Sequence, residues 1–292
     1  MVPVNDAMNN LTPRLVAVVV LYRTAAADSA TLRSLHAAME ASPEAAGELE
    51  VVIWDNTPGV RERPTGFSGT YWHTPSNPGL AAAYNHALEH ARERGAQWVI
   101  TLDQDTHITV DYLQELLHAT RHTSAAAVLP RLTWQGRMLS PFRPRTQGPA
   151  LPLEDTLTGN TSEYLQAFNS GAALSVAFLS GTGGFDADFP LDYLDHATFA
   201  RMHREGGGIH ILHAHLEHEL SSQTPGRLTP AAMQRERSVL ASERRFVRAY
   251  GTPDEQRMYP VRMLRRAASV LAHRRDPALA LLIVRTLLGG NQ

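Results

Sequence analysis

The sequence predicts an α/β fold, in which an open sheet is flanked by helices. Apolar runs alternate with amphipathic segments between residues 15 and 119, and these runs are rich in valine, leucine and isoleucine. Such runs are typical of parallel strands that are buried on both faces. Polar clusters at 22–24, 55–59 and 103–106 follow three of the runs. Because ligands of open α/β sheets collect at the carboxyl ends of the strands, these clusters indicate a nucleotide or a phosphorylated ligand.

The expected elements follow from hydrophobic periodicity. In the first part they are strands at 15–22, 49–54 and 97–102 and helices at 28–40, 78–94 and 109–119. Residues 133–160 hold several prolines and glycines without a period, so we expect a long connection there. A helix at 193–207, closed by glycine, and a strand at 208–218 come next. Helices at 230–250, 257–274 and 277–288 complete the prediction.

Charge divides the chain into an acidic body, 1–226, and a basic helical extension, 227–292. The extension holds 13 arginines and 5 acidic residues, a net charge of +8, whereas the body holds 14 arginines and 24 acidic residues, a net charge of −10. We therefore predict two domains with a boundary at 226/227. A basic extension contacts an anionic membrane, pairs with the acidic body, or forms the solvated faces of helices.

Composition narrows the chemistry and the location. The chain of 292 residues has no cysteine, so disulfides and thiolate metal sites are excluded and any metal must bind oxygen or imidazole. The early apolar run "LVAVVVLY" is shorter than a signal peptide requires and fits a buried strand better. We expect a cytoplasmic protein, and we expect no nucleic-acid partner.

The stretch "WVITLDQDT" places Asp103 and Asp105 at the end of a predicted strand. Two carboxylates leaving a strand offer a hard oxygen site for Mg²⁺ or Mn²⁺, although a solvated turn or a helix cap would also explain them. A phosphotransferase of the haloacid-dehalogenase type requires threonine where His107 stands, and an EF-hand requires glycine where Ile108 stands. Both of these alternatives fit poorly.

The surrounding residues resemble a known family. The segment "NPGLAAAYNHALEHARERGAQWVITLDQDT", residues 77–106, resembles the asparagine–glycine helix and Asp-x-Asp block of family 2 glycosyltransferases, particularly the bacterial rhamnosyltransferase-like branch. Upstream, "VAVVVLYRT" and "VVIWDNTPG" are similar to the first two strands of that family. Downstream, "FNSGAALS", "GGFDADFPLDYLDHATFAR" and "LEHEL" are similar to its later motifs, so that the resemblance covers residues 15–220.

This resemblance implies a GT-A fold, an open mixed sheet flanked by helices that binds a nucleotide-sugar. Tyr22 and Asp55 would then hold the base, Asp55 by accepting from a pyrimidine imide N–H. The wall beside the ribose and the diphosphate would be formed by Asn77, Gly79 and Asn85. For Asn77 and Gly79, a helix N-cap and a tight turn are simultaneous structural roles. The amides after Pro78-Gly79 would approach a phosphate.

The same resemblance assigns the metal site. Asp103 would contact the ribose or act through the metal, and Asp105 would bind Mg²⁺ or Mn²⁺ directly. His218 falls at the late histidine of the family, near the metal or the diphosphate. A divalent ion neutralises the charge that develops on the departing nucleoside diphosphate.

Asp195 is the expected catalytic base. Aligned on Gly184-Phe185-Asp186 and Arg201, it falls where the family places its catalytic carboxylate, which implies a single displacement with inversion at the anomeric carbon. Asp192 is a weaker candidate with an alternative N-cap role, and the helix dipole alone would favour Asp195 in a first turn. Ala197 stands where the family often carries a second acid.

The substrates remain open at this point. The resemblance implies a dTDP-rhamnose-like donor, with UDP-galactofuranose, UDP-hexose and GDP-sugar as alternatives, and a saccharide or polyprenyl-linked glycan as the acceptor in bacterial surface polysaccharide synthesis. A protein of another class, a catalytically silent nucleotide-sugar-binding or membrane scaffold, is the remaining alternative. The set of Asp103, Asp105 and Asp195 argues against it.

The extension suggests further partners. "YPVRMLRRAASVLAHRR" places Val261, Leu264, Ala268 and Leu271 on one stripe among arginines. This arrangement suits a helix that lies at the inner face of the cell membrane, a homodimer interface, or a helix packed on the body. "PALALLIVRTLL" is too short to span a bilayer.

Overall fold

The computed structural model describes residues 13–65, 69–145, 150–218 and 229–288. These residues form two compact units. The first takes in the described parts of 1–143 and 151–220, and the second takes in those of 144–150 and 221–292. The predicted boundary at 226/227 lies outside the described residues.

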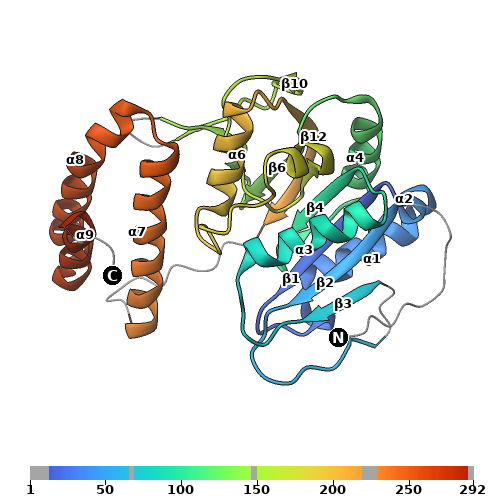
Figure 1. The fold of residues 1–292 in the computed structure, drawn as a ribbon, viewed down its shortest axis with the longest axis horizontal. Coiled ribbons are helices and arrows are strands. Elements are labelled where there is room, and N and C mark those ends of the chain that lie inside the picture. Colours follow the sequence, from blue (N-terminus) through green and yellow to red (C-terminus); the bar gives the residue numbers. More distant parts are fainter. Residues whose placement is uncertain (1–12, 66–68, 146–149, 219–228, 289–292) are drawn as a thin grey trace. The chain divides into compact units, whose positions relative to one another are not determined.

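The first unit is built on one large sheet (Figure 1). Its strands are β1 (Leu15–Leu21), β2 (Leu49–Asp55), β3 (Thr70–His73), β4 (Trp98–Leu102), β5 (Thr106–His107), β6 (Ala127–Trp134), β7 (Arg137–Ser140), β10 (Gly159–Thr161), β11 (Ala172–Ser175) and β12 (Ile209–His218). The spatial order is β10-β12-β6-β11-β4-β1-β2-β3, while β5 pairs with β12 and β7 pairs with β6. A second, two-stranded sheet joins β8 (Phe142–Arg143) to β9 (Leu151–Pro152).

Six α-helices connect or flank these strands. They are α1 (Ala30–Ala41), α2 (Pro43–Glu48), α3 (Leu80–Glu93), α4 (Val110–His122), α5 (Val176–Gly181) and α6 (Leu194–Arg204), preceded by the 3₁₀ turn η1 (Ala26–Asp28). The cap of α1 is Ser29, whose hydroxyl accepts from the N–H of Leu32, and the cap of α4 is Thr109, whose hydroxyl accepts from the N–H of Tyr112. The helices predicted at 28–40, 78–94, 109–119 and 193–207 correspond to α1, α3, α4 and α6.

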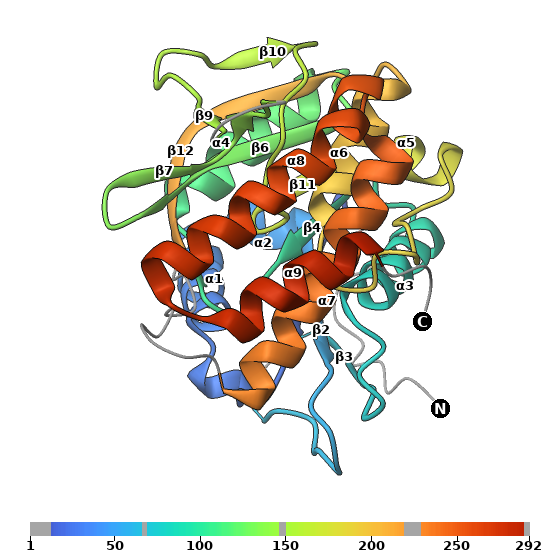
Figure 2. The ribbon, with the colours of Figure 1, turned by 90° about the vertical axis from the view of Figure 1, so that its left-hand side faces the viewer.

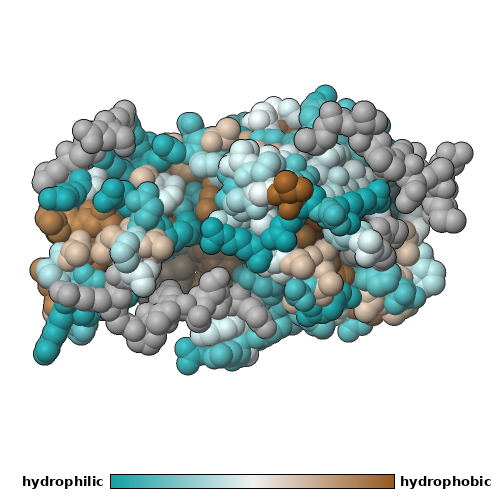
Figure 3. Space-filling view, turned by 90° about the horizontal axis from the view of Figure 1, so that it is seen from below, coloured by the Kyte–Doolittle hydropathy of each residue, from teal (hydrophilic) through white to brown (hydrophobic). Residues whose placement is uncertain are grey.

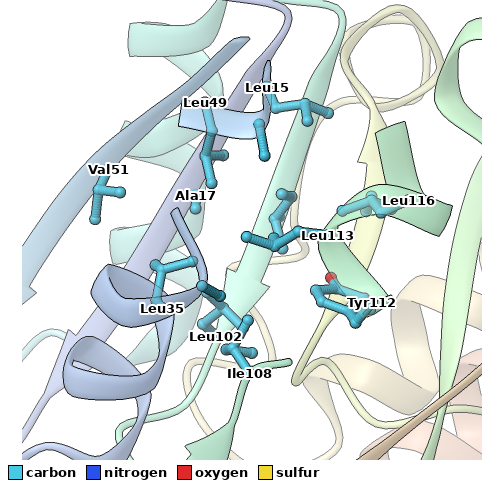
Figure 4. Close-up of a cluster of buried hydrophobic side chains, with 14 of the residues drawn as sticks. Leu15, Ala17, Leu35, Leu49, Val51, Leu102, Ile108, Tyr112, Leu113 and Leu116 are labelled. Atoms are coloured by element: carbon cyan, nitrogen blue, oxygen red, sulfur yellow. The ribbon is translucent and has the colours of Figure 1, made fainter. Parts of the chain in front are cut away.

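The parallel half of the sheet consists of β3, β2, β1 and β4. All seven residues of β1 are buried, which explains its unbroken apolar sequence. On one face, alternate β1 side chains such as Leu15 and Ala17 pack with Leu35 of α1 and with Leu113 and Leu116 of α4 (Figure 4). In Figure 1, α3 crosses β1 and β4, and it buries an alanine-rich face.

The other half makes the sheet mixed. β11 runs antiparallel to both β4 and β6, whereas β6 and β12 run parallel. Pro130 in β6 has no N–H to donate, and opposite it the register of β12 shifts between Ile211 and His215. The carboxylate of Glu115 accepts from two backbone N–H groups inside this irregularity, at 2.7 and 2.8 Å. An open mixed sheet flanked by helices was predicted, and it is confirmed.

The long connection expected over 133–160 includes short strands. This segment contains β7, β8, β9 and β10 within its described part, and β6 begins before it at Ala127. Short strands of this kind leave no clear period in the sequence. Arg131 anchors the connection, because its guanidinium is 1% exposed and donates to the carbonyl oxygens of Asp155 and Leu157.

The second unit is helical. It contains α7 (Pro230–Tyr250), α8 (Pro253–Ser269), a π-helical continuation η2 (Val270–Arg274), and α9 (Pro277–Leu288). The helices α8 and α9 lie side by side, and α7 contacts both (Figure 2). Their core joins Leu240, Met263 and Ile283, each 0% exposed. Among the described residues, no helix is long and apolar enough to cross a membrane.

Each of these helices starts with the same local signal. Thr229, Thr252 and Asp276 each precede a proline and accept a backbone N–H of the first turn with the side chain. Proline at the first helical position loses no hydrogen bond, and the capping oxygen satisfies an otherwise free donor. The start of α8 also has a full capping box with Glu255. The predicted helices at 230–250, 257–274 and 277–288 therefore correspond to α7, α8 with η2, and α9.

Candidate active site

Polar side chains gather where three neighbouring parallel strands end. Tyr22 follows β1, Asp55 is the last residue of β2, and Asp103 follows β4. Because β1 pairs in parallel with both β2 and β4, these residues lie along one edge of the sheet. This is the edge at which open α/β sheets bind their ligands.

Asp103, Asp105 and His218 form a cluster at this edge. Their ligand atoms all lie within 4.8 Å of one another. β12 brings His218 there, because His218 pairs in register with Thr106 of β5, and its Nδ1 lies 3.7 Å from Oδ1 of Asp105. Two carboxylates suit Mg²⁺ and Mn²⁺, and the imidazole favours Mn²⁺, the softer of the two. This donor set therefore fits a divalent cation.

Three buried hydroxyls fix the cluster. Thr31 Oγ1 donates to the carbonyl oxygen of Asp103 at 2.6 Å and accepts from the N–H of Thr106 at 2.8 Å. Ser170 Oγ accepts from the N–H of Asp103 at 3.2 Å and lies 2.5 Å from Thr106 Oγ1. The latter oxygen is 3.0 Å from Nδ1 of His218. The hydroxyls of Thr31 and Ser170 were not predicted, and the only signal for Ser170 was a polar residue inside an otherwise small and apolar segment.

The electrostatics of the cluster favour a cation. Burial raises the pKa of Asp103 to about 6, and the negative charges of Asp105 and Asp195 add to this rise while His218 opposes it. A carboxylate that is destabilised by burial and by like charges is stabilised by a bound positive charge. Asp103 and Asp105 therefore form a site that a divalent cation would complete.

Asp195 lies within electrostatic range of this cluster. It lies in the first turn of α6, which follows Tyr193 in the left-handed region at φ 65°. Its Oδ1 accepts from the N–H of His196 at 2.8 Å. Its charge raises the pKa of both Asp103 and Tyr84, so the carboxylate lies close to these two residues. Strained backbone of this kind is concentrated at functional sites.

Tyr84 of α3 is a residue that sequence analysis did not single out. Its side chain is 0% exposed, and its hydroxyl has no hydrogen-bond partner among the described residues. Burial raises its pKa well above the usual value, and Asp103 and Asp195 add to the rise. The hydroxyl consequently stays protonated beside two carboxylates.

Gly79 has a structural role at the start of α3. The N–H groups of Leu80 and Ala81 at the start of α3 donate to the carbonyl oxygen of Pro190, at 2.6 and 3.1 Å, rather than facing open space for a phosphate. Gly79 has φ 94°, and a Cβ there would collide with the same carbonyl group. Only glycine permits this approach. The start of α3 thus holds the segment that leads into Asp195.

Asn85 is engaged in a similar way. Its Oδ1 accepts from the N–H of Phe185 at 2.7 Å, and its Nδ2 donates to the carbonyl oxygen of Phe185 at 2.8 Å. The carbonyl oxygen of Gly184 accepts from Arg201 of α6. Asn85 therefore fixes the backbone of Phe185 with both polar atoms of its amide, while Arg201 binds the carbonyl of Gly184.

A cavity of about 400 Å³ opens beside Asp55. Its lining includes apolar side chains of Leu21 and Leu32 and the charged side chains of Arg33 and Arg61. Asp55 is 5% exposed, and its oxygens accept from the N–H of Thr57 at 2.8 Å and from the hydroxyl of Tyr71 at 3.1 Å. A lining that is partly apolar with a few polar groups is typical of pockets for small ligands.

The two remaining predicted residues are more exposed. Tyr22 is 40% exposed, its N–H donates to the side chain of Gln104 at 2.9 Å, and the Arg23 guanidinium lies 5.1 Å from its ring. Asn77 is exposed in the turn before Pro78, with φ 47°. The backbone of Tyr22 is held beside the Asp103 loop through Gln104. Asn77 is not one of the residues that form the cation cluster.

Comparisons with known proteins identify this arrangement. The open mixed sheet with an acidic cluster at its carboxyl edge is that of a GT-A glycosyltransferase. The model of glycosyl transferase family 2 matches residues 18–178, more than half of the chain, and the protein therefore belongs to glycosyl transferase family 2. A search of curated proteins found no match.

Solved structures agree with the fold. S. aureus TarS 1-349 is 14% identical, with a TM-score of 0.51, and the match covers 95% of this chain and 92% of that chain. The same protein in complex with UDP is also 14% identical, with a TM-score of 0.52, and the match covers 95% of this chain and 92% of that chain. For its complex with UDP-GlcNAc the identity is 14% and the TM-score is 0.51, and the match covers 89% of this chain and 81% of that chain. Similarity at this level of identity concerns the fold alone.

Proposed function

We propose that the protein is a metal-dependent, inverting glycosyltransferase that uses Asp195 as its catalytic base. One observation carries this proposal: the charge of Asp195 acts on Asp103, so a third carboxylate lies near the Asp103, Asp105 and His218 cluster. A cation site and a separate base are the two groups that sugar transfer from a nucleoside diphosphate requires.

Each group has a distinct role in the proposal. The residues Asp103, Asp105 and His218 would hold Mg²⁺ or Mn²⁺, which would supply positive charge to the diphosphate. Asp55 and Tyr22 bind the base at the cavity. Asp195 accepts the proton of the acceptor hydroxyl as that oxygen attacks the anomeric carbon, and the nucleoside diphosphate departs from the opposite face. Residue 197 is a buried alanine, so Asp195 has no auxiliary acid two residues further along the chain.

For the donor we propose dTDP-rhamnose, with other sugar nucleotides as alternatives. The carboxylate of Asp55 beside a partly apolar cavity supports a pyrimidine base. S. aureus TarS, which shares the fold, has been solved with UDP and with UDP-GlcNAc, and this supports a pyrimidine nucleoside diphosphate in general. We propose a saccharide or a polyprenyl-linked glycan of a bacterial surface polysaccharide as the acceptor.

Thermal unfolding with a panel of nucleotides tests the donor and the metal together. We expect dTDP or UDP to raise Tm only when Mn²⁺ or Mg²⁺ is present, because the ligands bind the folded state as a pair. Asp105→Asn should remove this shift. Asp111→Asn, an exposed acid on α4, is the matched control and should keep it.

Two outcomes would contradict the proposal. A shift of equal size in the presence of a chelator would exclude the metal role. No shift with any nucleoside diphosphate would exclude donor binding and would favour the catalytically silent scaffold.

A further inference from the structure

One face of the second unit carries an apolar stripe that the unit itself does not use. The stripe runs along α8 and η2 at alternating spacings of four and three residues, which keep side chains on one helix face. Its members are Val261, Leu264, Ala268 and Leu271, and Arg257 lies one turn before it on the same helix face. Val261, Leu264 and Leu271 are 39%, 53% and 50% exposed, and Leu281 on the neighbouring α9 is 49% exposed. Hydrophobic atoms are visible at the left-hand edge of Figure 3, where α8 and α9 lie in Figure 1.

The fold of the unit does not require these side chains. The opposite face of α8 supplies the core, in which Tyr259, Met263 and Ala267 pack with Leu279 and Ile283 of α9. A helix that is apolar on both its core face and its outer face exposes more apolar surface than solubility favours. The outer stripe is therefore available to something outside the unit.

Arginines surround the stripe, and the acids of the unit are already engaged. Glu243 forms ion pairs with Arg262 and Arg266 at 3.0 Å each, and Asp276 caps α9. In contrast, four exposed arginines between residues 253 and 288 form no ion pair with any described residue. They are Arg265, Arg274, Arg275 and Arg285. The face thus combines exposed leucines with positive charge that no local acid neutralises.

We propose that the α8–α9 face of the second unit binds an anionic lipid surface. Leucines that enter the boundary between headgroups and acyl chains, with guanidinium groups at the level of the phosphates, satisfy both halves of this face. Guanidinium also matches phosphate oxygens in geometry. Binding of this kind keeps the protein peripheral to the membrane.

Two protein occupants fit the same face less well. A symmetric dimer would pack the stripe of one copy on that of another, and this would bring the unpaired arginines of both copies together. The first unit offers no comparable stripe among its described residues, because its exposed large hydrophobic side chains come from four separate segments. They are Tyr22, Val60, Leu151 and Leu191.

Sedimentation with lipid vesicles tests the proposal on the whole protein. The wild type should bind vesicles of phosphatidylcholine with about 30% phosphatidylglycerol far more tightly than pure phosphatidylcholine, and 0.5 M salt should weaken binding, since exposed charges are then screened. The double variant Arg265→Gln/Arg274→Gln should lose about 30-fold in affinity, which corresponds to about 1 kcal/mol per arginine. Leu264→Ser/Leu271→Ser should lose at least about tenfold.

Matched controls separate this surface from general effects. Val60→Ser, at a residue 97% exposed in the first unit, and Arg137→Gln, at an exposed arginine of β7, should leave vesicle binding unchanged. All variants should keep the wild-type Tm and the nucleotide-dependent shift, so failure of this proposal is distinct from failure of the proposed enzymatic function. Equal losses in the control variants would overturn the assignment.

Two further results would also overturn it. Absence of vesicle binding at low salt would exclude the lipid partner. A dimer in solution that Leu264→Ser/Leu271→Ser dissociates, without vesicle binding by the wild type, would assign the face to a second copy of this chain.

Discussion

Asn85 holds the backbone of Phe185 at both its N–H and its carbonyl oxygen, with distances of 2.7 and 2.8 Å. Asn85→Ala should therefore lower the free energy of unfolding by about 2 kcal/mol, because both backbone groups lose a partner. Urea unfolding followed by circular dichroism measures this loss. Glu93→Ala, at an exposed position of the same helix, should change stability by less than about 0.5 kcal/mol. A loss of similar size in both variants would show that the helix, and not the link to Phe185, had been weakened.

Gly79→Ala should impair the site through the segment that leads to Asp195. The substitution combines a left-handed φ of 94° with a collision against the carbonyl group of Pro190. Gly59→Ala is a close control, because Gly59 has φ 93° but no atom within 4 Å of the added Cβ. We expect Gly59→Ala to cost about 1 kcal/mol and Gly79→Ala clearly more, with a loss of transfer activity only in the latter. Equal losses of stability and activity in the two variants would contradict a role for the contact with Pro190.

Asp195→Asn should separate chemistry from binding. The amide cannot accept the proton of the acceptor hydroxyl, so the transfer rate should fall by about 100- to 10,000-fold. The affinity for the nucleoside diphosphate should stay within a few-fold, because Asp195 is not part of the cation cluster. Glu205→Gln, at the exposed end of α6, should retain the wild-type rate. Residual turnover with lost nucleotide binding would contradict the role as base.

Removal of the hydroxyl should affect the free energy of unfolding differently for two buried tyrosines. Tyr112 donates to the carbonyl oxygen of Gly171 at 2.7 Å, so Tyr112→Phe should cost about 1 to 2 kcal/mol of stability. Tyr84 has no such partner among the described residues, and Tyr84→Phe should leave the free energy of unfolding unchanged or raise it. Chemical denaturation of both variants decides the matter, and a marked loss for Tyr84→Phe would refute it.

Stability should depend on pH through Glu50. Burial opposes ionisation of this carboxyl, but hydrogen bonds and charge from His90 and Arg94 outweigh burial and hold its pKa below the usual 4.5. A lowered pKa in the folded state contributes stability that is present above pH 4.5 and is lost as pH falls through the folded value. Glu50→Gln should therefore be less stable than the wild type at pH 6, and the difference should narrow below pH 4.5. A difference in Tm that does not change between pH 6 and pH 3.5 would contradict this linkage.

Strong local signals made much of the fold predictable. β1 is apolar throughout because it is buried on both faces, and α7 begins with the threonine–proline pair that marks a helix start. β6 was missed because Pro130 and the buried Arg131 interrupt its apolar pattern. The sequence does not reveal that a ladder irregularity with Glu115 accommodates the proline, since these residues lie far apart along the chain.

The candidate site, like the fold, was predictable only in part. Asp103 and Asp105 follow a strand with a recognisable pattern, and His218 was placed by its resemblance to a late motif. The hydroxyls of Thr31 and Ser170 were not predicted, because serine and threonine are common and their role depends on contacts across the fold. The contacts of Gly79 and Asn85 were not predicted for the same reason: their partners Pro190 and Phe185 are remote in sequence.

The contact between Gly79 and the carbonyl of Pro190 limits how such an enzyme can diversify. Gly79 lies in the segment that would bind the donor, and Pro190 lies in the segment that would bind the acceptor. A chimera in which the segment around Pro190 comes from another glycosyltransferase must place a carbonyl group at the same position. Otherwise the N–H groups of Leu80 and Ala81 in α3 lose their hydrogen-bond acceptor. Exchange of acceptor preference between relatives should therefore succeed only when both segments are inherited together.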